Sequence, residues 1–440
     1  MEFSMNSVGI VITVNGLESN LDFKRTGIPL SVIRRKALQT QTLHDALVAI
    51  YKSPRAVSNN MFMSTIRVLC CLLVLCMPCA SALASAYEFD ATYTGDIWSN
   101  TSGGIRTGTR YLDNLDLTLE VDVDEAWNFG SGTFFVYGMY NNNSTFSEEL
   151  VGDLQVISNI EASRAWRIYE FWYQYGKGPW SFRLGLYDLN SEFDVAETRG
   201  LFLNSSNGIG PDMSQTGLNG PSIFPITSLS LRSEFKSDQF TARMAVLDGV
   251  PGDPDDPASN VIRLGNDDGV LIVGELDYAV GEDSRVWAGY WRYSAEFEHA
   301  FDQGLSNDND GWYFGIEKAF QLRTKSAGWF LRFGRVNDDL NPIGNFIGAG
   351  ATIDGLFSTR PHDQFGFAIA SAGAGSPYKN FLNQAGLVAK NRETTWELTY
   401  RAEINPHLVL QPDIQYVQYP SASSEYRNAF AVGLRFELSY

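Results

Sequence analysis

Two neighbouring segments combine aromatic, carboxylate, amide and guanidinium side chains at alternate positions. The stretch AWRIYEFWYQY, from Ala165, carries Glu170, Trp172 and Gln174 on one parity. Planar hydrogen-bonding groups can engage neighbouring hydroxyls, and aromatic faces can pack against C–H surfaces. This combination could therefore hold a polyhydroxylated solute weakly. The following stretch, RLGLYDLN, adds Arg183, Tyr187, Asp188 and Asn190 to the set.

These side chains belong to segments that alternate between apolar and polar residues. LDLTLEVDVD, from Leu115, places leucines and valines on one parity and Asp116, Glu120 and Asp122 on the other. Because successive side chains of a strand point to opposite faces, the pattern predicts a strand with one wet side. The pattern recurs from Tyr87 to the last residue, and helical periodicity is scarce. We count sixteen strands, of which two are weaker, near residues 89–96 and 378–385.

The connections between the expected strands alternate in length. Turns such as 176–178 and 405–406 are short, and long polar segments alternate with them. Because lipid offers no hydrogen bonds to a sheet edge, a sheet that crosses a membrane must close on itself. Strands of about ten residues with alternating short and long connections are typical of outer-membrane barrels. The sequence predicts an all-β fold, a 16-stranded antiparallel transmembrane β-barrel with short periplasmic turns and long extracellular loops. The expected long loops are 98–114, 141–165, 188–226, 248–269, 295–310 and 336–363.

Aromatic residues near strand ends could form the girdles at the two membrane interfaces. The candidates are Trp172, Tyr173, Trp287, Trp291, Trp312, Trp329 and Trp396. A secreted soluble sandwich with one solvated face is the alternative fold. It would leave the loop lengths and the wet face unconnected.

If the apolar parity faces lipid, the polar parity lines the lumen. Any such side chain could instead be a solvated wall residue or one half of a salt bridge. The further pore-lining candidates are Arg232, Arg243, Arg332 and Arg401, which would face an acidic first wall at Asp116 and Glu120. The loop 188–225, rich in Asn, Ser and Gly, follows the fifth strand and is a candidate to fold inward and narrow the pore. A plain surface loop is its alternative.

The amino-terminal region does not resemble the rest of the chain. Residues 61–86 have a basic residue, a short apolar run and the small-residue site Ala84-Ser85-Ala86, which together predict a cleaved secretory signal peptide. Residues 1–60 are interpreted as a mis-assigned extension before an initiator at Met61 or Met63, or else as a long targeting segment. The mature barrel domain would then be 87–440.

Composition excludes several classes of function. Residues 1–86 contain 8 Lys and Arg, 4 Asp and Glu and all four cysteines, which leaves 25 basic and 47 acidic residues and no thiol in 87–440. Such acidity makes nucleic acid an improbable partner. The three remaining histidines lie in no recognisable constellation with a nucleophile, so we expect no enzyme and no required cofactor. The acidic stretches from Asp248 and Asn307 could hold calcium, although neither has EF-hand spacing.

The last strand keeps its alternation up to the terminal residue, Tyr440. It must pair with the first strand to close a barrel. Its pattern and terminal aromatic are similar to the signal that the outer-membrane assembly machinery reads, although Phe is the usual last residue.

Several segments resemble the carbohydrate-selective porin family, the OprB type. They are YLDNLDLTLEVDVD, FFVYGMYN, VGDLQVISNIEA, RIYEFW, RLGLYDLNSEFDV, LFLNSSNGIGPDMSQTGLNGPSIFP and AVLDGVPGDPDDP, and they span much of the mature chain. The resemblance implies an outer-membrane channel, in contact with lipid and lipopolysaccharide, for passive diffusion of glucose and other small sugars. The alternatives are a nonselective or cation-preferring porin and, from a different class, a plugged structural or adhesive barrel.

Overall fold

The computed structural model describes residues 2–5, 9–14, 17–22, 86–128, 130–142, 145–256, 258, 262, 265, 268–298, 305–322 and 325–440. The chain divides into two compact units, Met1–Ala80 and Ser81–Tyr440. In the first unit, β1 (Glu2–Met5), β2 (Gly9–Val14) and β3 (Leu17–Asp22) form an antiparallel sheet. The expected signal peptide lies outside the described residues apart from Ala86, so its cleavage stays a prediction.

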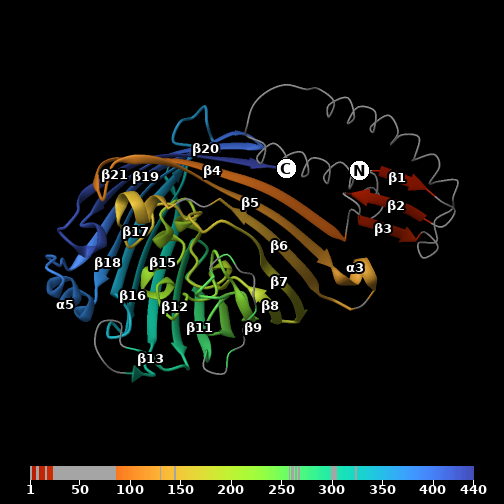
Figure 1. Cartoon of the computed structure of the whole chain (residues 1–440), viewed down its shortest axis with the longest axis horizontal. Coiled ribbons are helices and arrows are strands. Elements are labelled where there is room, and N and C mark those ends of the chain that lie inside the picture. The colour runs from red at the N-terminus through yellow and green to blue at the C-terminus, as the bar shows by residue number, and fades with distance from the viewer. Residues whose placement is uncertain are drawn as a thin grey trace. The chain divides into compact units, whose positions relative to one another are not determined.

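In the second unit the described residues form one closed barrel of sixteen antiparallel strands, which confirms the expected fold (Figure 1). Each of these sixteen strands pairs with the next of the sixteen along the chain, so β12 pairs with β15, and β21 pairs with β4 to close the ring. The strands are β4 (Tyr87–Gly104), β5 (Gly108–Asp122), β6 (Thr133–Asn141), β7 (Ala165–Lys177), β8 (Trp180–Tyr187), β9 (Ser228–Lys236), β10 (Phe240–Asp248), β11 (Val270–Ala279), β12 (Ser284–Tyr293), β15 (Asp310–Leu322), β16 (Lys325–Val336), β17 (Ile343–Asp354), β18 (Gln364–Ala374), β19 (Arg392–Asn405), β20 (Leu408–Gln418) and β21 (Arg427–Ser439).

The closing pair shows why the carboxyl end is so regular. Leu434 lies opposite Ile97 and Leu438 opposite Tyr93, and the backbone amide of Tyr440 donates to the carbonyl of Ala91 at 3.0 Å. Leu434 and Ile97 are both exposed on the outer face. The alternation therefore supplies a lipid-facing surface at the seam while the backbone groups of both edges are paired.

Three expectations about the elements were wrong. Residues 378–384 lie in the helix α5 (Ser376–Gln384) and Ala385 caps it, whereas the missing strand is β17, inside the segment expected to be the long loop 336–363. The centre of β17 is GAGA, from Gly348, so the middle of this strand lacks the large apolar side chains that mark a strand. The expected loop 98–114 is mostly β4 and β5, joined by residues 105–107.

The wall of β7 contains a bulge that sets the direction of its side chains. Tyr137 of β6 pairs with Glu170, whereas the next residue, Gly138, pairs with Ile168, so Tyr169 is inserted. Tyr169 and Glu170 are both buried inside, while Ile168 and Phe171 on either side are exposed. A bulge of this kind changes the parity of a strand. It brings Glu170, Trp172 and Gln174 to the inner face.

Three residues expected in the aromatic girdles lie inside the barrel instead. Trp172, Trp287 and Trp291 are buried, and the last two pack in a core with Leu189, Phe193 and Met213 of the connection between β8 and β9. They occupy the inner parity, opposite exposed outer residues such as Tyr290. The remaining candidates, Tyr173, Trp312, Trp329 and Trp396, are exposed on the outer face.

We predict that Leu434→Arg weakens the folded barrel by about 2–4 kcal/mol in a bilayer, because it places a charge on the lipid face. The heat-modifiable migration of the refolded chain on a gel would measure the folded fraction. Asp90→Arg is the matched control, since Asp90 is exposed on the inner face of the adjacent strand. Equal losses in the two variants would contradict the assignment of the faces.

Candidate functional site

The connection between β8 and β9, residues 188–227, which we name loop 3, folds into the barrel and crosses it. The hydroxyl of Thr198 donates to Glu317 of β15 at 3.0 Å, and Gln411 of β20 donates to the carbonyl of Leu201 at 2.8 Å. The short helices of the loop are η4 (Leu189–Ser191), η5 (Glu197–Arg199), η6 (Ser205–Asn207) and α4 (Pro211–Ser214). Loop 3 thus reaches the far wall, which confirms that it folds inward.

A buried ion-pair network holds loop 3 against β16. Arg332 is fully buried, and its guanidinium contacts Asp194 at 3.0 Å and also Asp212, both from the loop. Arg199 adds a second contact with Asp194 at 3.0 Å. Burial alone would raise the pKa of Asp194, but Arg332 and Arg199 outweigh it and lower that pKa. Arg332 therefore fixes the loop and is covered by it, so the expectation that it lines the pore was wrong.

Two carboxylates on β19 hold two different loops. Glu397 accepts hydrogen bonds from the backbone amides of Leu203 and Asn204 and from the side chain of Asn207, all in loop 3. Four residues earlier and on the same face, Glu393 accepts from the amide of Leu154 at 2.8 Å. Leu154 belongs to the connection between β6 and β7, residues 142–164, which we name loop 2.

Loop 2 is also turned inward. The side chain of Gln415 on β20 donates to the carbonyl of Ile157 at 2.8 Å, and Ser158 donates to Asp96 on β4 at 2.7 Å. The amide of Asn159 bonds to the carbonyl of Leu203 in loop 3 at 2.8 Å. The two loops therefore form one hydrogen-bonded insert that contacts the inner face of β4, β15, β16 and β19 to β21.

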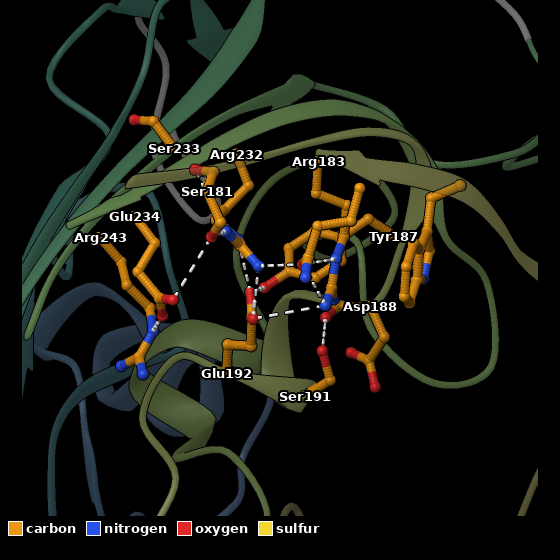
Figure 2. Close-up of polar contacts among 12 residues, drawn as sticks. Ser181, Arg183, Tyr187, Asp188, Ser191, Glu192, Arg232, Ser233, Glu234 and Arg243 are labelled. Atoms are coloured by element: carbon orange, nitrogen blue, oxygen red, sulfur yellow. Dashed lines mark hydrogen bonds and ion pairs between the residues drawn. The ribbon is translucent and has the colours of Figure 1, made fainter. Parts of the chain in front are cut away.

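The inner face of β7 to β10 carries a cluster of arginines, drawn in Figure 2, in which Arg183 and Arg243 are partly exposed. Arg232 is 1% exposed, so it supports the cluster from below and, like Arg332, does not line the pore as expected. Arg183 of β8 lies directly opposite Arg232 of β9. Glu192 of loop 3 contacts Arg232 at 2.7 Å and Arg183 at 3.5 Å, and it accepts a hydrogen bond from the hydroxyl of Tyr187 at 2.5 Å. Its carboxylate therefore offsets the repulsion between the two guanidinium groups. Burial opposes ionisation, yet these two arginines lower the pKa of Glu192 below its ordinary value.

Gln174 and Glu234 complete this cluster. The side-chain oxygen of Gln174 accepts from Arg183 at 2.9 Å and from Arg232 at 2.8 Å. Glu234 pairs with Arg243 at 2.8 Å, and these two side chains are each 16% exposed. The cluster therefore presents donors and acceptors side by side, all held in place by other protein groups.

Trp172 stands between Arg183 and a further aromatic ring. The guanidinium of Arg183 lies 3.8 Å from the centre of the indole, and the ring of Phe135 stacks on it at 4.9 Å and 23°. Because β6 and β8 flank β7 on opposite sides, these groups approach the indole from opposite sides. Trp172 therefore positions Arg183 and has little ring face left for a solute.

Gly185 allows this stack to form. It lies directly opposite Trp172, has φ of +144°, and a Cβ atom there would come within 2.6 Å of the Cα of Trp172. A side chain at this position would push β8 away from the tryptophan.

The remaining expected site residues lie apart from the arginine cluster. Glu170 accepts from the indole of Trp172 at 2.9 Å, Asp188 caps the amide of Asn190 at 2.8 Å, and Asn190 donates to the carbonyl of Phe193 at 3.1 Å. These three residues shape the start of loop 3. Asp116 accepts from the hydroxyl of Tyr137 at 2.6 Å, Arg401 pairs with Glu437 at 3.2 Å, and Glu120 is exposed on the inner face.

The sequence pattern missed Glu192, Asp194 and Phe135. The first two lie in a loop, where no strand parity tells which way a side chain points. Phe135 belongs to a run of large apolar residues, TFFVYGMY, in which the inner and outer parities look alike. Its pairing opposite Trp172 identifies its face only once the register is known.

Two of the acidic residues that could hold calcium, Asp308 and Asp310, have protein partners instead. Asp308 pairs with Arg292 at 3.3 Å, and Asp310 accepts from the hydroxyl of Tyr290 at 2.7 Å. Among the described residues no three His, Cys, Asp or Glu side chains come together in a geometry that could hold a metal ion. Nor does the described part of the chain contain a helix long and apolar enough to cross a membrane.

Comparison with known proteins agrees with this architecture. The model of the family described as "Carbohydrate-selective porin, OprB family" matches residues 106–440. The chain belongs to this family. A curated relative, Porin B of Pseudomonas aeruginosa, is 21% identical over 405 residues, which cover 81% of this chain and 88% of the relative.

Two solved structures of OprB from Pseudomonas putida have the same fold. The high-pH structure gives a TM-score of 0.73 at 18% identity, and the matched region covers 81% of this chain and 95% of that structure. The low-pH structure gives 0.52 at 16% identity, with 81% and 94% covered. Family and fold imply an outer-membrane location and point to a sugar-selective channel that is not an enzyme.

We predict that Arg332→Ala loosens loop 3 in this porin. The change leaves Asp194 and Asp212 buried with one counter-charge fewer, at a cost of about 3–5 kcal/mol. Single-channel recordings should show a larger and noisier conductance than the parent. Arg335→Ala is the control, because Arg335 is exposed on the same strand. A conductance unchanged by Arg332→Ala would contradict the role of this ion pair.

Loop 2 gives a pH-dependent prediction at Glu161. Burial, together with the carboxylates of Asp153 and Glu148, raises the pKa of Glu161 from 4.5 to about 8. Between pH 4.5 and about 8 the folded protein keeps this proton while the unfolded chain loses it. The free energy of unfolding therefore falls as the pH rises from about 4.5 to 8. Glu161→Gln should raise the unfolding temperature in detergent at pH 9 and change it little at pH 5.

Glu149→Gln is the control for this measurement, since Glu149 is exposed and paired with Arg106 and Arg110. It should give no gain at pH 9. An equal gain for Glu161→Gln at both values of pH would show that the effect is unrelated to ionisation.

Proposed function

We propose that this porin lets glucose and other small sugars diffuse passively through a constriction between loop 3 and the wall of β7 to β10. The observation that carries the proposal is the cluster of Arg183, Arg232, Glu192 and Gln174, in which Glu192 comes from the loop and the others from the wall. Arg232 is 1% exposed, so Arg183, Glu192 and Gln174 are the members of the cluster that a sugar would contact. A sugar at this place would replace hydrogen bonds to water with hydrogen bonds to these groups.

Binding at this cluster would be weak enough for transport. Arg183 is 12% exposed and Glu192 17% exposed, so both already have most of their surface covered by protein. In its contacts with the described residues, Arg183 uses Nε and Nη2 and keeps Nη1 for a solute. A channel needs sites that bind well enough to admit a solute and release it quickly. Prearranged groups with a few open positions meet both needs, and no energy source is required.

The export and assembly of the chain follow the same proposal. Residues 61–86 would be removed as a signal peptide, and the last strand, ending in Tyr440, would be read by the barrel assembly machinery. The short turns would then face the periplasm, and the loops would meet lipopolysaccharide. We expect no nucleic-acid partner.

One observation favours a cation-preferring porin as a second candidate. Glu88, Asp90 and Glu120 are exposed on the inner face of β4 and β5, and among the described residues none of them forms an ion pair. A lumen with unpaired carboxylates attracts cations. Sugar block would separate this candidate from the sugar-selective one.

We predict that millimolar glucose blocks the single-channel current of the refolded chain from Tyr87 in a saturable way. Arg183→Ala should raise the concentration for half block by about 10- to 100-fold, because it removes a charged donor worth roughly 1.5–3 kcal/mol. Arg427→Ala, on the exposed end of β21, is the control. A steady current that glucose leaves unchanged would favour the cation-preferring porin, and a chain without conductance would be a plugged barrel.

A further inference from the structure

The inner wall of the barrel is divided into a covered part and an open part. On β16, β19 and β20 the charged inner residues Arg332, Glu393, Glu397 and Asp413 are buried by loops 2 and 3, whereas Arg401 and Glu437, nearer the turns, stay partly exposed. On the turn-side ends of β4 and β5, Glu88, Asp90 and Glu120 are exposed. On the turn side of the arginine cluster, the exposed wall of β4 and β5 is therefore within reach of a solute.

One row of side chains crosses this open wall. Glu88 lies opposite Glu120, Glu120 opposite Phe135, and Phe135 opposite Trp172. Directly paired residues share a face of the sheet and have Cβ atoms about 4.5–5.5 Å apart. The row thus brings two exposed carboxylates beside a partly exposed aromatic ring that ends the stack of Arg183 and Trp172.

Contacts within the described part of the protein satisfy the groups of this row only in part. Two glutamates directly opposite each other repel, and among the described residues neither has a basic partner. Phe135 uses one face against Trp172, and Tyr137 touches it edge-on at 6.4 Å. The remaining ring face and the carboxylates fit a ligand that has an apolar side and several hydroxyl donors.

We propose that Phe135 and Glu120 form a second sugar subsite on the turn side of the arginine cluster, where a hexose stacks on the phenyl ring and donates hydroxyl hydrogen bonds to the carboxylate. This inference rests on the proposed sugar passage and extends it. The arginine cluster supplies mainly donors to the sugar, and the new subsite supplies acceptors and a ring. A sugar released by the cluster therefore has a second, chemically different place to bind before it leaves.

The test is glucose block of single channels with sugar added to one side at a time. Phe135→Ala should weaken block by turn-side glucose about 3- to 10-fold, the range expected for one aromatic contact, and affect loop-side glucose less. Phe135→Trp should retain block, and Glu120→Gln should weaken it in the same direction. Phe134→Ala is the matched control, since Phe134 lies on the outer parity and packs against Phe171.

The orientation of the channel in the bilayer can be determined directly because residues 87–440 contain no cysteine. A single Ser424→Cys, exposed in the connection between β20 and β21, reports the loop side through a membrane-impermeant thiol reagent. Phe135→Leu keeps the apolar volume if the alanine variant folds poorly. If the parent is blocked by glucose but Phe135→Ala, Phe135→Leu and Glu120→Gln are blocked equally well from both sides, the subsite is overturned and the sugar channel stands. A parent that glucose does not block overturns both.

Discussion

Backbone pairing around a closed ring is the constraint on which the rest of this structure depends. A sheet in lipid cannot leave an edge unpaired, so the last strand must reach the first, and the seam of β21 with β4 makes the wall continuous. Closure gives every strand an inner and an outer face. The apolar side chains of each strand then face lipid, and the side chains at the alternate positions are available for contacts with loops and solutes.

The interior is organised by carboxylates and guanidinium groups that connect wall and loops. Arg332 contacts loop 3 from β16, while Glu397 and Glu393 hold loops 3 and 2 from β19. Each of these groups is buried, and such burial is tolerated only where partners satisfy the charge or the hydrogen bonds. The loops therefore act as an ordered part of the wall.

The sequence was sufficient for the fold because alternation is a property of each strand alone. LDLTLEVDVD shows its two faces without any knowledge of its neighbours, whereas β17, with Gly and Ala at its centre, shows no such alternation. The site was only partly predictable. Arg183, Arg232 and Gln174 follow from parity, but parity also selected Arg332, which the loop covers, since a strand pattern cannot say which inner residues a loop will bury. Glu192 depends on the path of loop 3, and Phe135 depends on register.

The origin of Glu192 has a consequence for how such a channel can change. The arginines belong to the fixed wall, whereas the carboxylate that neutralises them belongs to loop 3. The space beside the arginine cluster and the charge there thus both depend on loop 3. An insertion or deletion in that segment would alter size exclusion and ion preference together, so the two properties of the filter cannot vary independently while the wall stays the same.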